Sequence, residues 1–110
     1  MFGRKIYLKE HGIMGLLILL FLAQVANAQS DYFTRLRKQM VTQQLESRGI
    51  DDERVLDAFM DVERHEFVLP ENRGSAYRDS PLPIDEGQTI SQPYIVAYMT
   101  QALDLEQDDK

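Results

Sequence analysis

The stretch from Asp85 to Ala97 most constrains the fold, because within it a loop has to turn into a helix. Gly87 allows a tight bend, and the β-branched side chain of Thr89 favours extended backbone. Pro93 has a fixed φ angle that suits a first helical position, so the sequence predicts a helix that begins there. Ser91 is then expected at the entrance of this helix.

The position of Ser91 has two interpretations. The start of a helix leaves backbone N–H groups unpaired and carries the positive end of the helix dipole, so it attracts an anionic group such as a carboxylate. In the simpler interpretation, the side chain of Ser91 or Gln92 only caps the helix. The local sequence leaves both open.

Residues 1–28 have the layout of a secretory signal peptide. Its basic start consists of Arg4, Lys5 and Lys9. An apolar run from Ile13 to Ala23 follows, and Ala26–Ala28 supplies a small-x-small cleavage pattern. The run is shorter than the roughly 20 residues of a membrane-spanning helix, which makes an uncleaved anchor the less favoured alternative. We therefore expect a mature chain that starts at Gln29 and is periplasmic or secreted.

The predicted mature chain of 82 residues is acidic and lacks cysteine. Nine Lys and Arg residues face seventeen Asp and Glu residues, a net charge of −8 with histidine neutral. Binding to a nucleic-acid backbone depends on clustered positive charge, so nucleic acid is not an expected partner. Without cysteine, disulfides and thiolate chemistry are excluded.

Helical periodicity predicts three helices, near residues 31–48, 52–62 and 93–104. Ser30 or Asp31 is expected to cap the first helix, and Gly49 to end it. The apolar side of the first helix comprises Phe33, Leu36, Met40, Val41, Gln44 and Leu45. Asp51 is expected to cap the second helix, whose buried stripe is Val55, Leu56, Phe59 and Met60.

The third helix is expected to bury one side and expose the other. The buried side comprises Ile95, Val96, Met99, Ala102 and Leu103, and the outward side comprises Tyr98, Thr100 and Gln101. A long loop with a short strand pair, near Leu82–Ile84 and Gln88–Ile90, precedes this helix. The fold class is therefore mainly α. His65 is expected at the surface or behind a site, and the acidic end from Asp104 to Asp109 as a solvated connector with no metal.

Several strings, in this order, resemble the protein-L-isoaspartate O-methyltransferase family. They are Arg48-Gly49-Ile50, Arg54-Val55-Leu56, Arg64-His65-Glu66-Phe67-Val68, Ala76-Tyr77-Arg78-Asp79, Pro81-Leu82-Pro83-Ile84 and Gly87-Gln88-Thr89-Ile90-Ser91-Gln92-Pro93-Tyr94. The resemblance runs from about Met40 to Leu105. Several spaced matches are more specific than one short motif.

The resemblance implies a protein repair enzyme that transfers a methyl group from S-adenosylmethionine to the α-carboxylate of L-isoaspartyl residues. It implies that Ser91 holds the substrate carboxylate and that Gln88, Thr89, Ile90 and Ser91 border the cofactor. Some relatives also use a histidine five residues after the serine, where this chain has Val96. The implied partners are isoaspartyl-containing proteins and peptides, and the implied enzyme is a monomer.

The resemblance also implies a Rossmann-like α/β fold with a glycine-rich cofactor turn. This chain reaches Lys110 without a Gly-x-Gly motif. Residues 29–110 are therefore interpreted as the N-terminal helical cap and substrate loop of a truncated, inactive methyltransferase domain. The alternative is a small exported helical binding protein without catalytic activity, and the sequence beyond Lys110 would discriminate between the two. Family members are usually cytoplasmic, which conflicts with the predicted leader.

Overall fold

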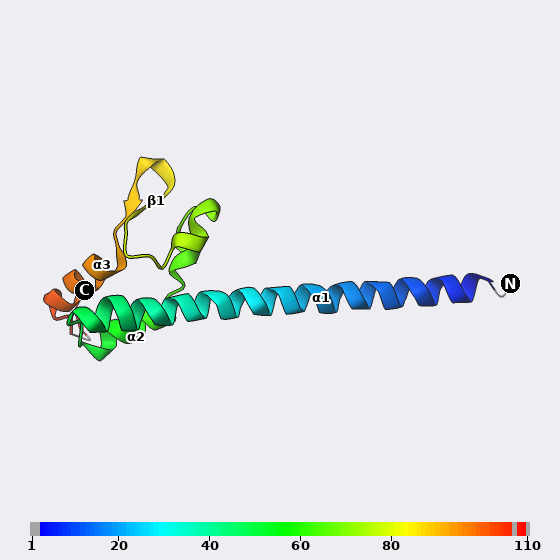
Figure 1. The fold of residues 1–110 in the computed structure, drawn as a ribbon, viewed down its shortest axis with the longest axis horizontal. Helices are drawn as coiled ribbons and strands as arrows, with labels where there is room; N and C mark the ends of the chain where they lie inside the picture. Colours follow the sequence, from blue (N-terminus) through cyan, green and yellow to red (C-terminus); the bar gives the residue numbers. More distant parts are fainter. Residues whose placement is uncertain (1–2, 107, 110) are drawn as a thin grey trace. The chain divides into compact units, whose positions relative to one another are not determined.

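The computed structural model describes residues 3–106 and 108–109, with side chains described from Glu10 onward. The chain divides into two compact units, Met1–Tyr32 and Phe33–Lys110. Helix α1 (Figure 1) is Gly3–Met40, and its residues 33–40 belong to the second unit.

The first unit is helical throughout its described residues, and its side chains from Glu10 to Tyr32 are exposed. Leu19 and Phe21, for example, are each 65% exposed. In the described part of the chain, one helical stretch, Glu10–Arg48, which includes most of α1, is long and apolar enough to cross a membrane, with a mean hydropathy of 1.7 over an 18-residue window. A signal sequence near an N-terminus meets the same criterion, so this helix agrees equally well with a leader.

The predicted start of the first helix at Ser30 or Asp31 is wrong, because α1 continues through both residues without a break. The physical reason lies in the composition between Gly15 and Gly49, which includes neither glycine nor proline. A serine or aspartate caps a helix only where the preceding residues leave the helical conformation, and here nothing forces them to do so.

The predicted end of this helix at Gly49 is confirmed. α1 passes into a π-helical turn, η1 (Val41–Leu45), and a 3-10 turn, η2 (Glu46–Arg48), before Gly49 adopts a left-handed φ of 91°. The predicted apolar side is also confirmed. Its buried members are Phe33, Met40, Val41 and Leu45, while Leu36 packs against them and Gln44 is half-buried.

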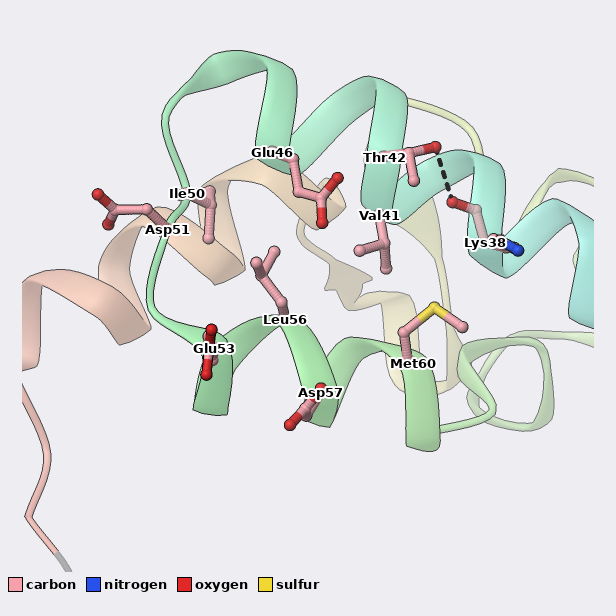
Figure 2. A pocket seen from close by; sticks show the side chains of 10 residues that line it. All are labelled: Lys38, Val41, Thr42, Glu46, Ile50, Asp51, Glu53, Leu56, Asp57 and Met60. Carbon is pink, nitrogen blue, oxygen red and sulfur yellow. Dashed lines mark hydrogen bonds between the residues drawn. The ribbon is translucent and has the colours of Figure 1, made fainter.

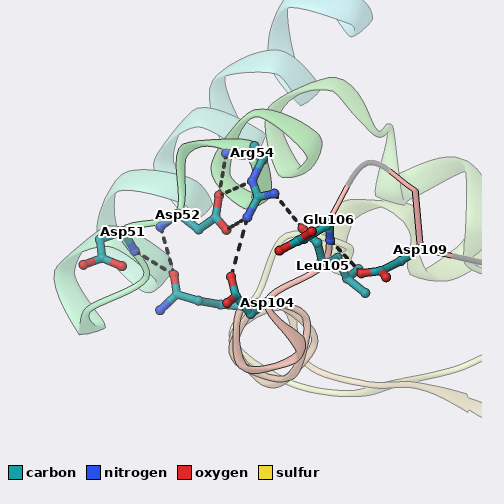
Figure 3. Close-up of polar contacts among 8 residues, drawn as sticks. Asp51, Asp52, Arg54, Asp104, Leu105, Glu106 and Asp109 are labelled. Atoms are coloured by element: carbon teal, nitrogen blue, oxygen red, sulfur yellow. Dashed lines mark hydrogen bonds and ion pairs between the residues drawn. The ribbon is translucent and has the colours of Figure 1, made fainter.

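Helix α2 is Glu53–Asp61, and the residue that caps it is Asp52, where the sequence predicted Asp51. The Asp52 carboxylate accepts a hydrogen bond from the Arg54 N–H at 2.9 Å. The backbone N–H groups of Asp51 and Asp52, both labelled in Figure 3, donate to Oε1 of Gln101, each at 2.9 Å. Gln101 therefore joins α3 to the start of α2, and its predicted outward position is wrong.

Helix α3 is Pro93–Leu103 and begins at the predicted residue. The side that it buries contains Pro93 and Ala97, whereas four of the five residues of the predicted buried side are exposed. They are Ala102 together with Ile95, Met99 and Leu103, and the last three are 40%, 61% and 68% exposed. This part of the prediction is wrong because α3 carries apolar residues on more than one side, and periodicity alone does not identify the side that meets the core.

The predicted strand pair is confirmed as the antiparallel strands β1 (Leu82–Pro83) and β2 (Thr89–Ile90), with Leu82 opposite Ile90. Their connection is a 3-10 turn, Asp85–Gly87, in which Glu86 and Gly87 have φ angles of 60° and 66°. Gly87 thus makes the tight bend expected of it.

A single hydrophobic cluster connects these elements within the second unit. Its buried members are Phe33, Met40, Val41, Leu45, Ile50, Val55, Val68, Ala76, Tyr77 and Ala97. Leu56, Phe59 and Met60 of the predicted α2 stripe pack against it. The architecture is the predicted one, mainly helical with a short strand pair, and the core supports the loop that leads into α3.

Candidate functional site

Ser91 lies between β2 and α3 and is exposed. Gln92 occupies the N-cap position without a side-chain capping bond, and within the described residues the Ser91 hydroxyl makes no hydrogen bond. The interpretation of Ser91 or Gln92 as a cap is therefore wrong. Because Pro93 has no N–H, the first unpaired backbone donors of α3 belong to Tyr94 and Ile95. The start of α3 thus presents a hydroxyl group that makes no hydrogen bond to another described residue.

The buried side chain of Arg64 holds the backbone of Ser91 in place. Arg64 begins the 3-10 turn η3 (Arg64–Phe67) and is 8% exposed. Its Nε donates to the Ala76 carbonyl and its Nη2 to the Ser91 carbonyl, each at 2.7 Å. Burial lowers the pKa of this guanidinium from its ordinary value. One buried side chain therefore connects η3, the segment at Ala76 and Ser91.

The Asp79 carboxylate makes a second connection beside Ser91. It forms an ion pair with both terminal nitrogens of Arg48, and its Oδ1 accepts a hydrogen bond from Gln92 Nε2 at 3.1 Å. The Arg48 guanidinium carbon also lies 4.9 Å from the centre of the Tyr94 ring. Arg48, at the end of η2, is thereby connected to Gln92 and Tyr94 at the start of α3.

Sequence reasoning missed the roles of Arg64, Arg48 and Asp79. All three belong to strings that resemble the family, but the strings do not indicate which residues meet in space. Arg64 and Ser91 are 27 residues apart, and Arg48 and Asp79 are 31 residues apart. Contacts over such separations leave no periodic signal in a single sequence.

The predicted cofactor-bordering residues form a continuous edge with Ser91. Gln88 and Thr89 are exposed, and Ile90 is half-buried. The backbone of Gln88 is held by hydrogen bonds to Asp85 at 3.2 Å and to Ile84 at 2.9 Å. Hydroxyl, carboxamide and backbone groups suit the ribose and amino-acid parts of S-adenosylmethionine. They fit as one wall of a site, because a ligand of that size is normally enclosed on several sides.

An apolar hollow of about 360 Å³ adjoins this edge. It is lined by Met40, Ala58, Phe59, Val62, Arg64, Phe67, Ile90, Val96 and Thr100. Val96 stands at the position where some relatives are expected to carry a histidine. The hollow therefore offers apolar contact at that position, with the Arg64 guanidinium as its charged lining residue.

His65 is buried, so of its two predicted positions the one at the surface is wrong and the one behind the site remains. It is 7% exposed, its ring stacks on Phe33 with the centroids 3.9 Å apart, and its Nδ1 shares a 2.8 Å hydrogen bond with the Tyr77 hydroxyl. Burial raises the pKa of Tyr77. His65 behaves as a hydrogen-bonded core residue that fixes the segment next to Ala76.

A larger hollow, of about 650 Å³, lies between η1 and α2, and none of the predicted site residues is among its lining residues (Figure 2). Val41, Leu56 and Met60 are among its apolar lining residues, and its acidic lining residues are Glu46, Asp51, Glu53 and Asp57. Among the described residues, no three or more His, Asp or Glu side chains are grouped to hold a metal ion. The acidic side chains here form a solvated rim.

Comparison with known proteins yields a family match over most of the second unit. The family model described as protein-L-isoaspartate(D-aspartate) O-methyltransferase matches residues 35–110. A protein-L-isoaspartate O-methyltransferase from Opitutus terrae is 52% identical over 98 residues, which are 88% of this chain and 42% of the relative.

Two further relatives carry the same name. The protein from a Synechococcus strain is 62% identical over 73 residues, 66% of this chain and 30% of the relative. The protein from Petrotoga mobilis is 53% identical over 77 residues, 70% of this chain and 36% of the relative. The chain thus spans 30–42% of the length of these three relatives. It belongs to the protein-L-isoaspartate(D-aspartate) O-methyltransferase family.

Proposed function

We propose that this chain forms the N-terminal helical cap and substrate loop of a repair methyltransferase, which methylates the α-carboxylate of L-isoaspartyl residues in damaged proteins. The identities of 52–62% to relatives with this enzyme name support the proposal. They also favour it over a small exported binding protein. The proposed partners are isoaspartyl-containing proteins and peptides, and the proposed enzyme is a monomer.

The observation that carries the proposal is the state of Ser91. Its hydroxyl is exposed and makes no hydrogen bond within the described residues, while its backbone is held by Arg64. A serine that serves only the fold normally uses its hydroxyl for a cap or a turn. A fixed serine with an unused hydroxyl at a helix start is suited to bind an incoming carboxylate.

Methylation of a carboxylate needs alignment more than base catalysis. A substrate carboxylate is already ionised at neutral pH, so no residue has to remove a proton from it. When bound, S-adenosylmethionine supplies an electrophilic methyl group on a positively charged sulfur. The Ser91 hydroxyl would donate a hydrogen bond to one carboxylate oxygen and leave the other free to attack. Gln88, Thr89, Ile90 and Ser91 would form one side of the cofactor site.

Replacement of Ser91 in a hybrid enzyme tests this role. In the hybrid, residues 35–110 of this chain replace the aligned segment of the Opitutus terrae relative. We expect Ser91→Ala to lower kcat/KM for an isoaspartyl peptide about ten- to a hundredfold, because a hydrogen bond to an ionised group contributes about 1.5–3 kcal/mol. The melting temperature should stay nearly constant, because the hydroxyl makes no bond in the fold.

Ser75→Ala in the same hybrid is the matched control, because the Ser75 side chain also makes no hydrogen bond within the described residues and it is not one of the proposed site residues. It should change neither quantity. Unchanged activity of Ser91→Ala, with a lowered melting temperature, would show that Ser91 serves the fold alone.

We also propose that residues 1–28 act as a cleaved leader and that the mature protein is periplasmic or secreted. The basic start, the apolar run and the Ala26–Ala28 pattern support this. N-terminal sequencing of the protein from a bacterial periplasmic extract should then begin at Gln29. A soluble cytosolic product that retains Met1 would refute export.

A further inference from the structure

Arg64 is a buried cation whose described hydrogen bonds both go to neutral acceptors. The two acceptors are the carbonyl oxygens of Ala76 and Ser91, each 2.7 Å from a guanidinium nitrogen. Burial of a charge without a charged partner is costly. The free-energy cost of burying the Arg64 charge is therefore not explained by packing alone. What the side chain contributes is a connection between two backbone segments, at Ala76 and at Ser91.

The segment at Ala76 is itself held firmly, so the connection through Arg64 leads to a fixed point. Ala76 is fully buried, and the neighbouring Tyr77 carbonyl accepts a 2.9 Å hydrogen bond from Gln44 Nε2. On the other side of Ser91, the Gln92 side chain donates to Asp79. The Ser91 backbone is thus fixed through Arg64 on one side and through Gln92 on the other, while its hydroxyl makes no hydrogen bond within the described residues.

We propose that Arg64 is a positioning residue for Ser91, which holds the Ser91 carbonyl against the Ala76 segment and so fixes where the hydroxyl meets a substrate carboxylate. The catalytic use of this arrangement rests on the proposed function. The claim that Arg64 holds the backbone of residues 91–96 in place does not rest on the proposed function, because it concerns the fold alone.

Arg64→Lys is the informative substitution, because it keeps the positive charge and removes the planar guanidinium group with its several donors. A guanidinium offers several donors in one rigid plane, whereas an ammonium group is a point donor on a flexible stem. Lysine is therefore not expected to hold the carbonyls of Ala76 and Ser91 together. Arg35→Lys is the matched control, since Arg35 is an exposed arginine of α1.

The first measurement is amide hydrogen exchange in the complete 110-residue chain. In Arg64→Lys, exchange in peptides that cover residues 91–96 should become about tenfold or more faster, as expected for the loss of a charge-assisted hydrogen bond. Peptides from α2 and all peptides of Arg35→Lys should exchange at the original rate. Unchanged exchange over residues 91–96, or equally faster exchange over the whole second unit, would overturn the proposal.

The second measurement is methyl transfer to an isoaspartyl peptide by the hybrid enzyme. Arg64→Lys should lower kcat up to about a hundredfold with a smaller effect on KM, because displacement by about 1 Å is enough for such a loss. In a Ser91→Ala background the same change should add little, since residues that act through one another are not additive. Full additivity would overturn the positioning role.

The two measurements separate the two claims. A hybrid with the original sequence that does not methylate the peptide would refute the proposed function, and the exchange data would still decide whether Arg64 orders residues 91–96. An active hybrid in which Arg64→Lys leaves kcat unchanged would refute the positioning role alone.

Discussion

Gly49 shows how a single backbone conformation ends a helical segment. Its φ of 91° lies in the left-handed region, and its N–H donates to the Glu46 carbonyl at 3.1 Å. No atom lies within 4 Å of the place where a Cβ would stand, so conformation alone disfavours a side chain here.

Gly49→Ala should destabilise the chain by about 1–2 kcal/mol, the cost of a left-handed conformation for a residue with a Cβ. The measurement is the free energy of unfolding in urea. Gly74→Ala is the control, because Gly74 also has open space around it and its φ is not in the left-handed region. Equal effects of the two substitutions would contradict this account.

Residues with strong conformational preferences were predictable, and residues with long-range contacts were not. Gly49, Gly87 and Pro93 adopt the conformations expected from their chemistry. The burial of His65 against Phe33, and the reach of Arg64 to Ser91, depend on how distant segments pack. A single sequence carries no record of such packing.

At the scale of elements, the start of α2 depends on a small network of polar groups. Asp52 caps the helix, and the Arg54 side chain donates to the same carboxylate at 2.8 Å and 3.1 Å (Figure 3). Oε1 of Gln101 accepts hydrogen bonds from the backbone N–H groups of Asp51 and Asp52. The hydrogen bond from Arg54 lowers the pKa of Asp52. The capped conformation is thus favoured when Asp52 is ionised.

Asp52→Asn keeps a capping oxygen but removes the charge that pairs with Arg54, so it should lower the melting temperature by a few degrees at neutral pH. A carboxyl group with a lowered folded pKa contributes stability above its unfolded value, 3.8, and loses it as the pH falls through the folded pKa. The difference in melting temperature between the original chain and Asp52→Asn should therefore disappear as the pH falls below 3.8. Thermal unfolding followed from pH 7 to pH 2 measures it.

Asp51→Asn is the control for this series, since Asp51 is exposed and contributes only its backbone N–H. It should leave the melting temperature nearly constant across the series. A larger effect at Asp51 than at Asp52 would restore the original assignment of the cap.

Helix α3 was placed correctly along the chain but with the wrong side inward. Sequence periodicity identifies a helix and its most apolar stripe. In α3 the small residue Ala97 is fully buried, while Met99 and Leu103 are exposed. A helix that carries apolar residues on both sides is typically covered on both sides. The position of its most apolar residues then does not identify the side that packs against the core.

A pair of identical leucine substitutions tests this orientation. Leu103→Ala should change the free energy of unfolding of the 110-residue chain by less than about 0.5 kcal/mol, because Leu103 is 68% exposed. Leu45→Ala removes a fully buried side chain and should cost about 2–5 kcal/mol. Similar losses at the two leucines would show that α3 presents its predicted side to the core.

At the scale of the whole molecule, the order of helices and the strand pair followed from local patterns, whereas the site is assembled by contacts that cross the chain. Arg48, Arg64, Asp79 and Ser91 come from four different segments and converge at the start of α3. The chain spans 30–42% of the length of the three relatives reported above. A functional test of the second unit therefore has to supply the remaining length from a relative.

The most direct test of the central claim is methyl transfer by the hybrid in which residues 35–110 replace the aligned segment of the Opitutus terrae relative. Two peptides of one sequence, with an isoaspartyl or an ordinary aspartyl residue, serve as substrates. We predict that the hybrid methylates the isoaspartyl peptide with a kcat/KM within about tenfold of the parent, as expected when the site geometry is kept, and leaves the aspartyl peptide unmodified. A stable, folded hybrid that methylates neither peptide, or both equally, would contradict the account.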